Sequence, residues 1–271
     1  MSGVVSAGIG IGIMIMPPTA GYLISNFGWR NSYIIVGLTV LVVVIINAQF
    51  LKRDPSQIGV SALGMAAQHA DNTSGYTFRE AMRTRQFWLI SAAFLLMALC
   101  LQTVFVHIVP HATDVGISGV KAATIISVIG GVSIISKVGV GIAVDRLGNK
   151  PIAIMVTSLM FLAMIIIQLS NELWVLYVFA AIFAFGYGGF SALQSPYVAE
   201  LFGLKALGVI FGFSFFIQMI VGACGPVVAG RIFDTAASYS PAFLILAIVS
   251  FLAVVLSIVI KATPYAAARK H

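Results

Sequence analysis

The chain has 271 residues, of which 60% are hydrophobic and only 8% are charged, and its formal net charge is +7 at pH 7. This composition excludes an ordinary soluble globular domain and predicts an integral membrane protein. The basic residues do not indicate nucleic-acid binding, because nearly all of them fall in the polar breaks between apolar segments.

A membrane-spanning helix needs about 20 largely apolar residues, and the sequence supplies eight such segments. They are residues 2–25, 31–51, 87–110, 122–144, 152–169, 173–199, 207–233 and 242–260. We therefore expect an all-α membrane protein with eight transmembrane helices. The one long polar linker divides the chain into three parts: residues 1–51, a central loop at 52–86, and residues 87–271.

The distribution of basic residues predicts the orientation. Lys137 lies inside an apolar segment, and only Arg30, Lys121 and Arg231 fall on one side of the membrane. The other eleven of the fifteen basic residues fall on the opposite side. Because positive charge collects in cytoplasmic loops, both termini and the central loop are expected in the cytoplasm, in a plasma or inner membrane.

The first segment is rich in glycine and proline. Gly8, Gly12 and Gly21 flank Pro17, and a turn at residues 26–30 leads into the second segment. This pattern does not predict a nucleotide-binding loop, because it follows no strand and lies within a spanning segment. In membranes, small residues allow helices to approach closely and proline bends them, so we expect a helix-packing face here.

The central loop ends in a helix signal. Thr77 and Glu80 have the spacing of a capping box, which predicts a short helix from that point. The helix would bring Arg79 and Arg83 onto one face, toward anionic lipid headgroups.

Two histidines, His107 and His111, lie four residues apart near the outer end of the third segment. Such a pair binds a metal, relays protons or only lines water. No third ligand lies nearby in the sequence, so the pair does not by itself predict a metal site.

Lys137 lies eight residues before a charged turn, which places it about 12 Å into the hydrocarbon layer. A lysine at that depth is energetically costly and therefore a candidate for function. Gly130, Ser133 and Gly141 share its helix face, and this small, polar stripe favours a neighbour other than lipid. The alternative is a lysine whose ammonium snorkels to the inner interface.

The sixth segment carries a cluster of glycines around Tyr187, followed by Gln194. Glycine at mid-membrane depth favours an irregular helix that lines a cavity, although a purely structural kink is the alternative. We predict that Lys137 faces a central cavity near Gln102, Tyr187 or Gln194.

The seventh segment repeats the first. Pro226 to Gly230 matches Pro17 to Gly21 at an offset of 209 residues. This long-period repeat predicts that Gly225, Pro226 and Gly230 form a packing motif like that of the first segment. If the first two segments correspond to the last two, four further helices would precede Met1. The chain would then be the last eight helices of a twelve-helix protein.

The charged turn after the fourth segment has the pattern of a known family. Gly141, Asp145, Arg146, Gly148 and Lys150 resemble the loop between helices eight and nine of the major facilitator superfamily. The glycine- and proline-rich first segment resembles helix five of that family. The resemblance implies a partial, N-terminally truncated twelve-helix fold, and it implies that the turn acts as a conformational switch. A positive-inside retention signal is the alternative.

Within the superfamily, residues 8–12, 27–30 and 107–117, together with Lys137, resemble the monocarboxylate and oxalate/formate branch. There, a cation on helix eight engages the substrate carboxylate, more often an arginine. Oxalate/formate members also carry a lysine on helix eleven, where this chain has Gln218. A singly charged substrate is therefore expected. The candidate substrate-binding residues are Lys137, Gln102, His107, Tyr187, Gln194 and Gln218.

The resemblance implies a secondary transporter that moves a small organic anion by alternating access, with a coupling proton or counter-anion. No enzyme chemistry, cofactor or metal site is expected, because all eight acidic residues lie in loops or near helix ends and the two cysteines are isolated. The rival hypothesis is a truncated membrane protein or gene fragment with a structural role. The missing helices, or a second copy, would then be needed for transport.

Overall fold

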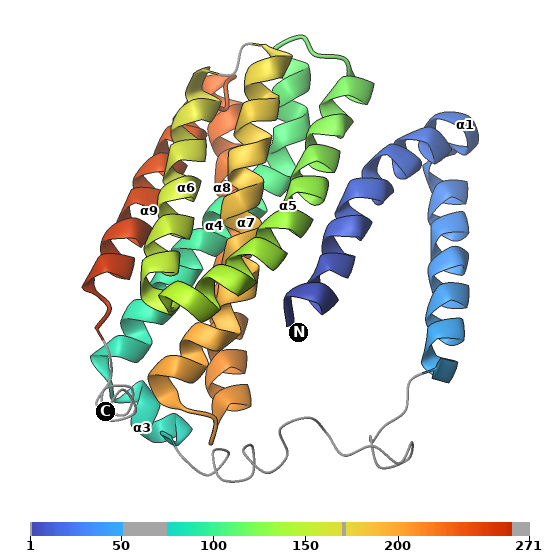
Figure 1. Cartoon of the computed structure of the whole chain (residues 1–271). Helices are drawn as coiled ribbons and strands as arrows, with labels where there is room; N and C mark the ends of the chain where they lie inside the picture. The colour runs from blue at the N-terminus through green and yellow to red at the C-terminus, as the bar shows by residue number, and fades with distance from the viewer. Residues whose placement is uncertain (1, 51–74, 170–171, 262–271) are drawn as a thin grey trace.

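The structure is a computed structural model that describes residues 2–50, 75–169 and 172–261. Most of the central loop predicted at 52–86 lies outside these residues. The described part is almost entirely helical (Figure 1). Its elements are α1 (Ser2–Phe50), α3 (Phe78–Met82), α4 (Arg85–Asp114), α5 (Gly119–Leu147), α6 (Asn149–Ile166), η2 (Ile167–Leu169), α7 (Leu173–Phe202), α8 (Leu207–Ala236) and α9 (Ser240–Val259).

The eight predicted apolar segments are confirmed, and the first two lie in the single element α1. Its backbone leaves the helical region at Gly28, where φ is 71° and ψ is 161°. Positive φ is accessible to glycine at little cost, so Gly28 allows the chain to reverse at the predicted turn. Among the described residues, seven helices are long and apolar enough to cross a membrane, and the first of them contains this kink.

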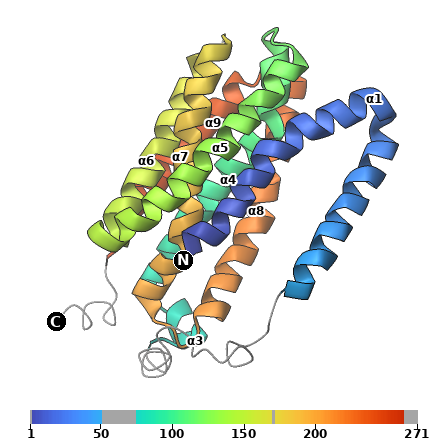
Figure 2. The same cartoon turned by 45° about the vertical axis from the view of Figure 1, so that its right-hand side comes forward.

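Helices α4 to α9 form a bundle, and the two arms of α1 relate to it differently. The arm before Gly28 lies along α5, whereas the arm after it stands apart from the bundle (Figures 1 and 2). Side chains of the second arm are largely exposed, for example Tyr33 at 73% and Leu38 at 58%. In a membrane this arm would face lipid or another polypeptide.

Helix α5 packs closely on two neighbours through small residues. On one side, a Cβ at Gly130 would overlap the backbone of Met14 in α1, and one at Gly10 would lie 3.0 Å from the carbonyl oxygen of Gly130. On the other side, a Cβ at Gly188 in α7 would lie 2.7 Å from the carbonyl oxygen of Ser133. Gly130 and Ser133 of the small-residue stripe therefore face protein, because only residues without bulk permit these approaches, whereas a Cβ at Gly141 would meet nothing within 4 Å.

The predicted glycine motifs divide into close and open positions. A Cβ at Gly225 in α8 would overlap the Thr103 side chain, and one at Gly230 would meet His107 at 3.8 Å. In contrast, Gly8, Gly12 and Gly21 have no heavy atom within 4 Å of a built Cβ. Among the described residues these three have no close helix neighbour, so the tight contact of the first segment belongs to Gly10 and not to them.

The end of the central loop is fixed to the end of the bundle where α7 ends. The Tyr76 amide donates to the carbonyl oxygen of Phe202 at 2.8 Å. The predicted capping box is confirmed: the Thr77 amide donates to Glu80 Oε2 at 2.7 Å, and the Glu80 amide donates to Thr77 Oγ1 at 3.4 Å. These hydrogen bonds with Thr77 lower the pKa of the Glu80 carboxyl.

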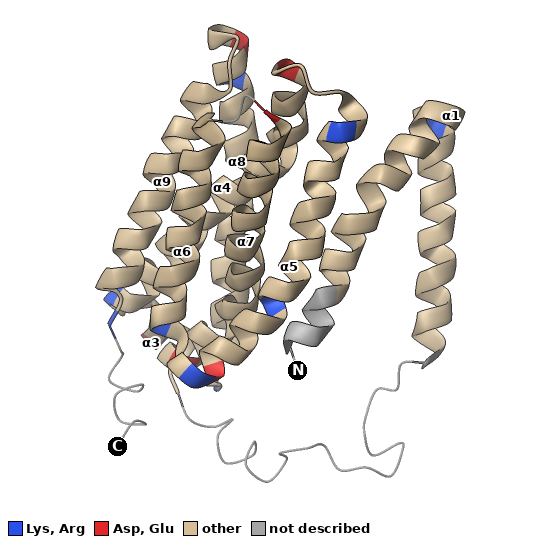
Figure 3. Cartoon of the chain, turned by 45° about the horizontal axis from the view of Figure 1, so that its top comes forward, with Lys and Arg blue, Asp and Glu red and all other residues tan. Residues whose placement is uncertain are grey.

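Charged residues gather toward the two ends of the bundle (Figure 3). Lys137 is the exception among the described residues, because it is fully buried within α5. The distribution agrees with helices that span an apolar layer, and it isolates Lys137 as a charged group inside that layer.

Candidate functional site

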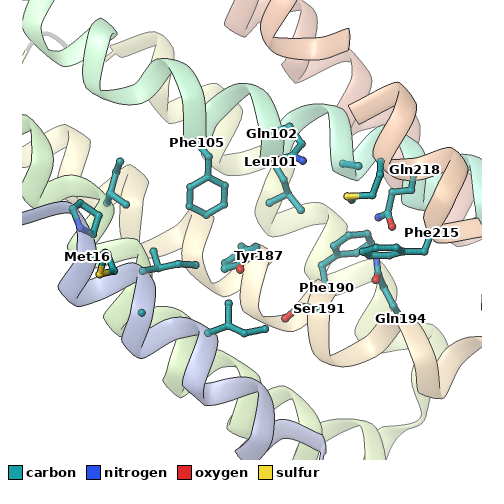
Figure 4. A pocket seen from close by; sticks show the side chains of 17 residues that line it. Met16, Leu101, Gln102, Phe105, Tyr187, Phe190, Ser191, Gln194, Phe215 and Gln218 are labelled. Carbon is teal, nitrogen blue, oxygen red and sulfur yellow. The ribbon is translucent and has the colours of Figure 1, made fainter. Parts of the chain in front are cut away.

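A cavity of about 780 Å³ opens between α1, α4, α7 and α8, with Ile126 of α5 on its wall (Figure 4). Gln102 comes from α4, Tyr187 and Gln194 from α7, and Gln218 from α8. Four of the six predicted substrate-binding residues are therefore brought together at one cavity. Its volume falls in the range of pockets that enclose small ligands.

The amide side chains of this cavity are held in place to different degrees. Gln218 is buried, and its Nε2 donates to the backbone oxygen of Phe94 at 3.2 Å. Gln194 is also buried, whereas Gln102 is partly exposed. Amides both donate and accept hydrogen bonds, so they give the cavity neutral polar groups at several points of its wall.

The remaining wall is mostly aliphatic, with three phenylalanine rings and one serine. The rings of Phe105, Phe190 and Phe215 project around the cavity together with Leu101 and Met16 (Figure 4). The Phe105 ring meets the Tyr187 ring edge-on, with the centroids 5.2 Å apart.

Lys137 lies behind this wall. Its side chain is fully buried, and its Nζ lies 5.1 Å from the centroid of the Tyr187 ring, a distance at which an ammonium is attracted to the ring face. Tyr187 itself lines the cavity. A snorkelling lysine would reach the bundle surface, and Lys137 does not. The Tyr187 ring therefore lies between the Lys137 ammonium and the cavity.

His107 does not line this cavity, contrary to the sequence-based expectation. Its Nε2 lies 2.9 Å from the backbone oxygen of Pro226, and its Nδ1 lies 3.3 Å from the hydroxyl of Tyr239. A carbonyl oxygen only accepts, so Nε2 carries the proton and Nδ1 of the neutral ring accepts from Tyr239. Both ring nitrogens are thus used in joining α4 to α8 and to the turn before α9.

The second histidine, His111, is buried beside the same turn. Its ring meets the rings of Tyr239 and Phe243 edge-on at 5.9 and 5.0 Å, and it lines a separate pocket of about 210 Å³ with Asp114. No group of three or more His, Cys, Asp or Glu side chains able to hold a metal occurs within residues 2–50, 75–169 and 172–261. The pair packs against aromatic rings.

The charged turn between α5 and α6 depends on Gly148, whose φ of 85° favours glycine. Asp145, Arg146 and Lys150 are exposed on this turn, and a Cβ at Gly141 would meet nothing within 4 Å. The turn is tied to α7 by another residue: Asn149 Nδ2 donates to Glu200 Oε2 at 2.6 Å.

Sequence reasoning missed the apolar members of the cavity wall. The chain has 19 phenylalanines, and nothing in the spacing of Phe105, Phe190 or Phe215 separates them from those that face lipid or core. Only the crossing of four helices selects them.

Comparisons with known proteins agree with this architecture. A sequence model of the Major Facilitator Superfamily matches residues 1–169 and 138–271. Monocarboxylate transporter 12 is 28% identical in Rattus norvegicus and 27% in Homo sapiens, over 90% of this chain and 55% and 52% of those proteins. Monocarboxylate transporter 4 of Rattus norvegicus is 22% identical, over 90% of this chain and 52% of that protein.

The chain thus spans about half the length of the curated relatives it matches. A crystal structure of a superfamily transporter, FucP, in the outward conformation superposes with a TM-score of 0.55 at 16% identity, over 87% of this chain and 55% of that one. That likeness shows the same fold over part of its length. Because the family match extends from the first residue to the last, the chain belongs to the Major Facilitator Superfamily.

Proposed function

We propose that the chain carries the binding site of a secondary transporter for a small organic monoanion, which works by alternating access. Lys137 is the cation that binds the carboxylate, Tyr187 covers its ammonium at the cavity wall, and Gln102, Gln194 and Gln218 bind the rest of the substrate. The relatives named monocarboxylate transporters support this substrate class.

The observation that carries the proposal is the position of Lys137. A buried ammonium is stable only beside groups that replace its hydration, and here its Nζ faces the ring of a cavity-lining tyrosine. No Asp or Glu lines the cavity within the described residues. A carboxylate that entered would therefore meet an attractive charge without a competing acid on the wall.

One cation favours a singly charged substrate. Gln218, at the position expected for a second cation, donates its amide to Phe94 and has no charge. A dianion would bring a second carboxylate into an apolar site with no cation for it among the lining residues, which is costly.

The turn at Asp145, Arg146, Gly148 and Lys150 is the proposed conformational switch, and it lies on the cytoplasmic side together with both termini. Its charges are exposed and available to a partner surface in one of two transport states. Replacing Asp145 by Asn would remove such a partner charge from one state only, and would shift the population between states. Unequal labelling of single cysteines at the outer end, in D145N and the parent, would support this role.

The test of the proposed function separates binding from transport. The purified chain is titrated with pyruvate in lipid nanodiscs, and reconstituted liposomes are assayed for pyruvate uptake. Saturable binding that is lost in Lys137→Met and retained in part in Lys137→Arg is expected. Binding that is unchanged in Lys137→Met would overturn the proposal.

The alternative function is structural, for a chain that does not transport alone. It is favoured by the exposed second arm of α1 and by the greater length of the relatives. Anion binding without uptake would indicate that further helices or a second copy are required for transport. The absence of both would support the structural role.

A further inference from the structure

We infer that the site selects a monoanion with a flat apolar body, an aryl-substituted carboxylate, over a short-chain acid of the same charge. The inference rests on the proposed function, because it takes Lys137 as the group that holds the carboxylate. What it adds is the chemistry of the rest of the substrate, which the cavity wall specifies.

The wall offers ring surfaces in several orientations. Phe105 presents its edge to Tyr187 at 5.2 Å between centroids, and Phe190 meets Phe94 edge-on at 5.4 Å. Phe215, from α8, lines the cavity while 43% of its surface is exposed. Aromatic rings pair best edge-to-face or offset-stacked, so walls of this kind accommodate an inserted ring with favourable contacts on more than one side.

The volume of the cavity also favours a substrate with a ring. A three-carbon acid has few apolar atoms, and in a cavity of about 780 Å³ it would leave most of the apolar wall against water. A ring-bearing acid would remove more apolar surface from water at the same charge cost. The binding free energy should therefore increase with the apolar area of the substrate body.

The arrangement along α7 sets the orientation of such a substrate. Tyr187, which contacts the Lys137 ammonium, and Phe190 are one helical turn apart, about 5 Å along the axis. A carboxylate placed at the Tyr187 end would put an adjoining ring beside Phe190 and Phe215. The amides of Gln194 and Gln218, beside Phe190 and Phe215 (Figure 4), would bind a hydroxyl group on the ring of the same substrate.

The experiment compares two acids that differ only in a phenyl ring. The full chain in lipid nanodiscs is titrated by calorimetry with pyruvate and with phenylpyruvate, with phenylmalonate as an aryl dianion and empty nanodiscs as the control for partitioning. We expect phenylpyruvate to bind at least about tenfold more tightly than pyruvate. We expect phenylmalonate to bind more weakly than phenylpyruvate.

Two phenylalanine variants locate the effect. In Phe215→Ala the ratio of the pyruvate to the phenylpyruvate dissociation constant should fall toward one. The neighbouring Phe216 is 62% exposed and does not line the cavity, so Phe216→Ala should leave the ratio unchanged. Equal effects in the two variants would overturn the assignment of the ring to this wall.

The outcomes distinguish this inference from the function beneath it. Equal affinity for the two keto acids, with both lost in Lys137→Met, would overturn the aryl preference and leave the proposed function standing. Unchanged affinity for both keto acids in Lys137→Met would overturn the proposed function, whatever their ratio. Failure of every acid to bind would overturn both.

Discussion

Lys137 and His107 are both polar side chains buried within long apolar helices, and their surroundings differ. The two ring nitrogens of His107 face a backbone oxygen and a tyrosine hydroxyl, so the ring bridges α4, α8 and the turn before α9. The ammonium of Lys137 faces the Tyr187 ring, and Tyr187 also lines the cavity.

The difference teaches that burial alone does not mark a binding residue. A histidine whose donor and acceptor are both used by fixed groups stabilises the fold and has little capacity left for a ligand. A cation held by a ring at a cavity wall can exchange that contact for a stronger one with an anion. We therefore expect substitutions at Lys137 to alter ligand affinity and substitutions at His107 to alter stability.

The largest effect is expected from Lys137→Met, which keeps much of the side-chain volume and removes the charge. Loss of one partner of a buried charge pair costs about 2 kcal/mol or more, so pyruvate affinity should fall at least roughly 30-fold. The melting temperature in detergent should not fall, because an apolar side chain replaces a costly buried ammonium. Calorimetry and differential scanning fluorimetry measure the two quantities.

Lys121→Met is the matched control for this change, since Lys121 is an exposed lysine on the same helix. It should leave both affinity and melting temperature unchanged. If Lys137→Met lowered the melting temperature but left the pyruvate affinity of the folded protein unchanged, Lys137 would be a stabilising residue and not a binding residue.

A smaller effect is expected from Gly188→Ala, which tests the close approach of α5 and α7. The new Cβ would lie 2.7 Å from the carbonyl oxygen of Ser133 and 2.8 Å from the Cβ of Ser136. Overpacking of this kind costs about 1–3 kcal/mol, so the melting temperature should fall. Pyruvate affinity should fall with it, because the helices that carry Lys137 and Tyr187 would separate.

Gly186→Ala is the control on the same helix. Its Cβ would meet the flexible end of Met160 at 3.3 Å, which can move aside. Similar melting temperatures for the two variants would show that the α5–α7 contact is looser than the structure indicates.

His107→Ala, on the stability side of the comparison, should lower the free energy of unfolding by about 1–3 kcal/mol, because it leaves the partly buried oxygen of Pro226 and the hydroxyl of the buried Tyr239 without this partner. Tyr239→Phe, which removes only a hydroxyl, should cost about 1 kcal/mol. Neither change should alter pyruvate affinity in the folded protein. Loss of affinity in His107→Ala at constant stability would return His107 to the substrate site.

Much of the fold was predictable from the sequence, because the membrane imposes one strong rule. Spanning segments must be apolar and about 20 residues long, so composition located all eight, and the positive φ of Gly28 agrees with the turn expected at 26–30. Polar residues at mid-membrane depth are rare, which is why Gln102, Tyr187 and Gln194 could be selected before their cavity was known.

The rest could not be predicted, because it depends on how helices cross. The glycines of the first segment alternate, and only the position of α5 distinguishes Gly10, which is tightly packed, from Gly8 and Gly12, which are not. His107 has the same polarity signal as Gln102, yet its ring nitrogens face Pro226 and Tyr239 and it does not line the cavity. Phe105 and Phe215 carry no signal at all among the other apolar residues.

The smallest expected effect concerns Tyr187, the residue between Lys137 and the cavity. Its ring attracts the ammonium, whose Nζ lies 5.1 Å from the ring centroid. An entering carboxylate must compete with that attraction, which is worth about 0.5–1 kcal/mol and more when desolvated. Removing the ring therefore removes a competitor of the substrate.

Tyr187→Leu should then bind pyruvate more tightly, by about two- to fivefold from 0.5–1 kcal/mol. Tyr187→Phe keeps a ring face for the ammonium and should bind pyruvate like the parent. Pyruvate is the correct probe because its small body makes little use of the aromatic wall, so the contact between Lys137 and the ring dominates the change. A weaker affinity in Tyr187→Leu would mean that the ring binds the substrate directly and does not only cover the cation, and it would place Tyr187 among the substrate-binding side chains.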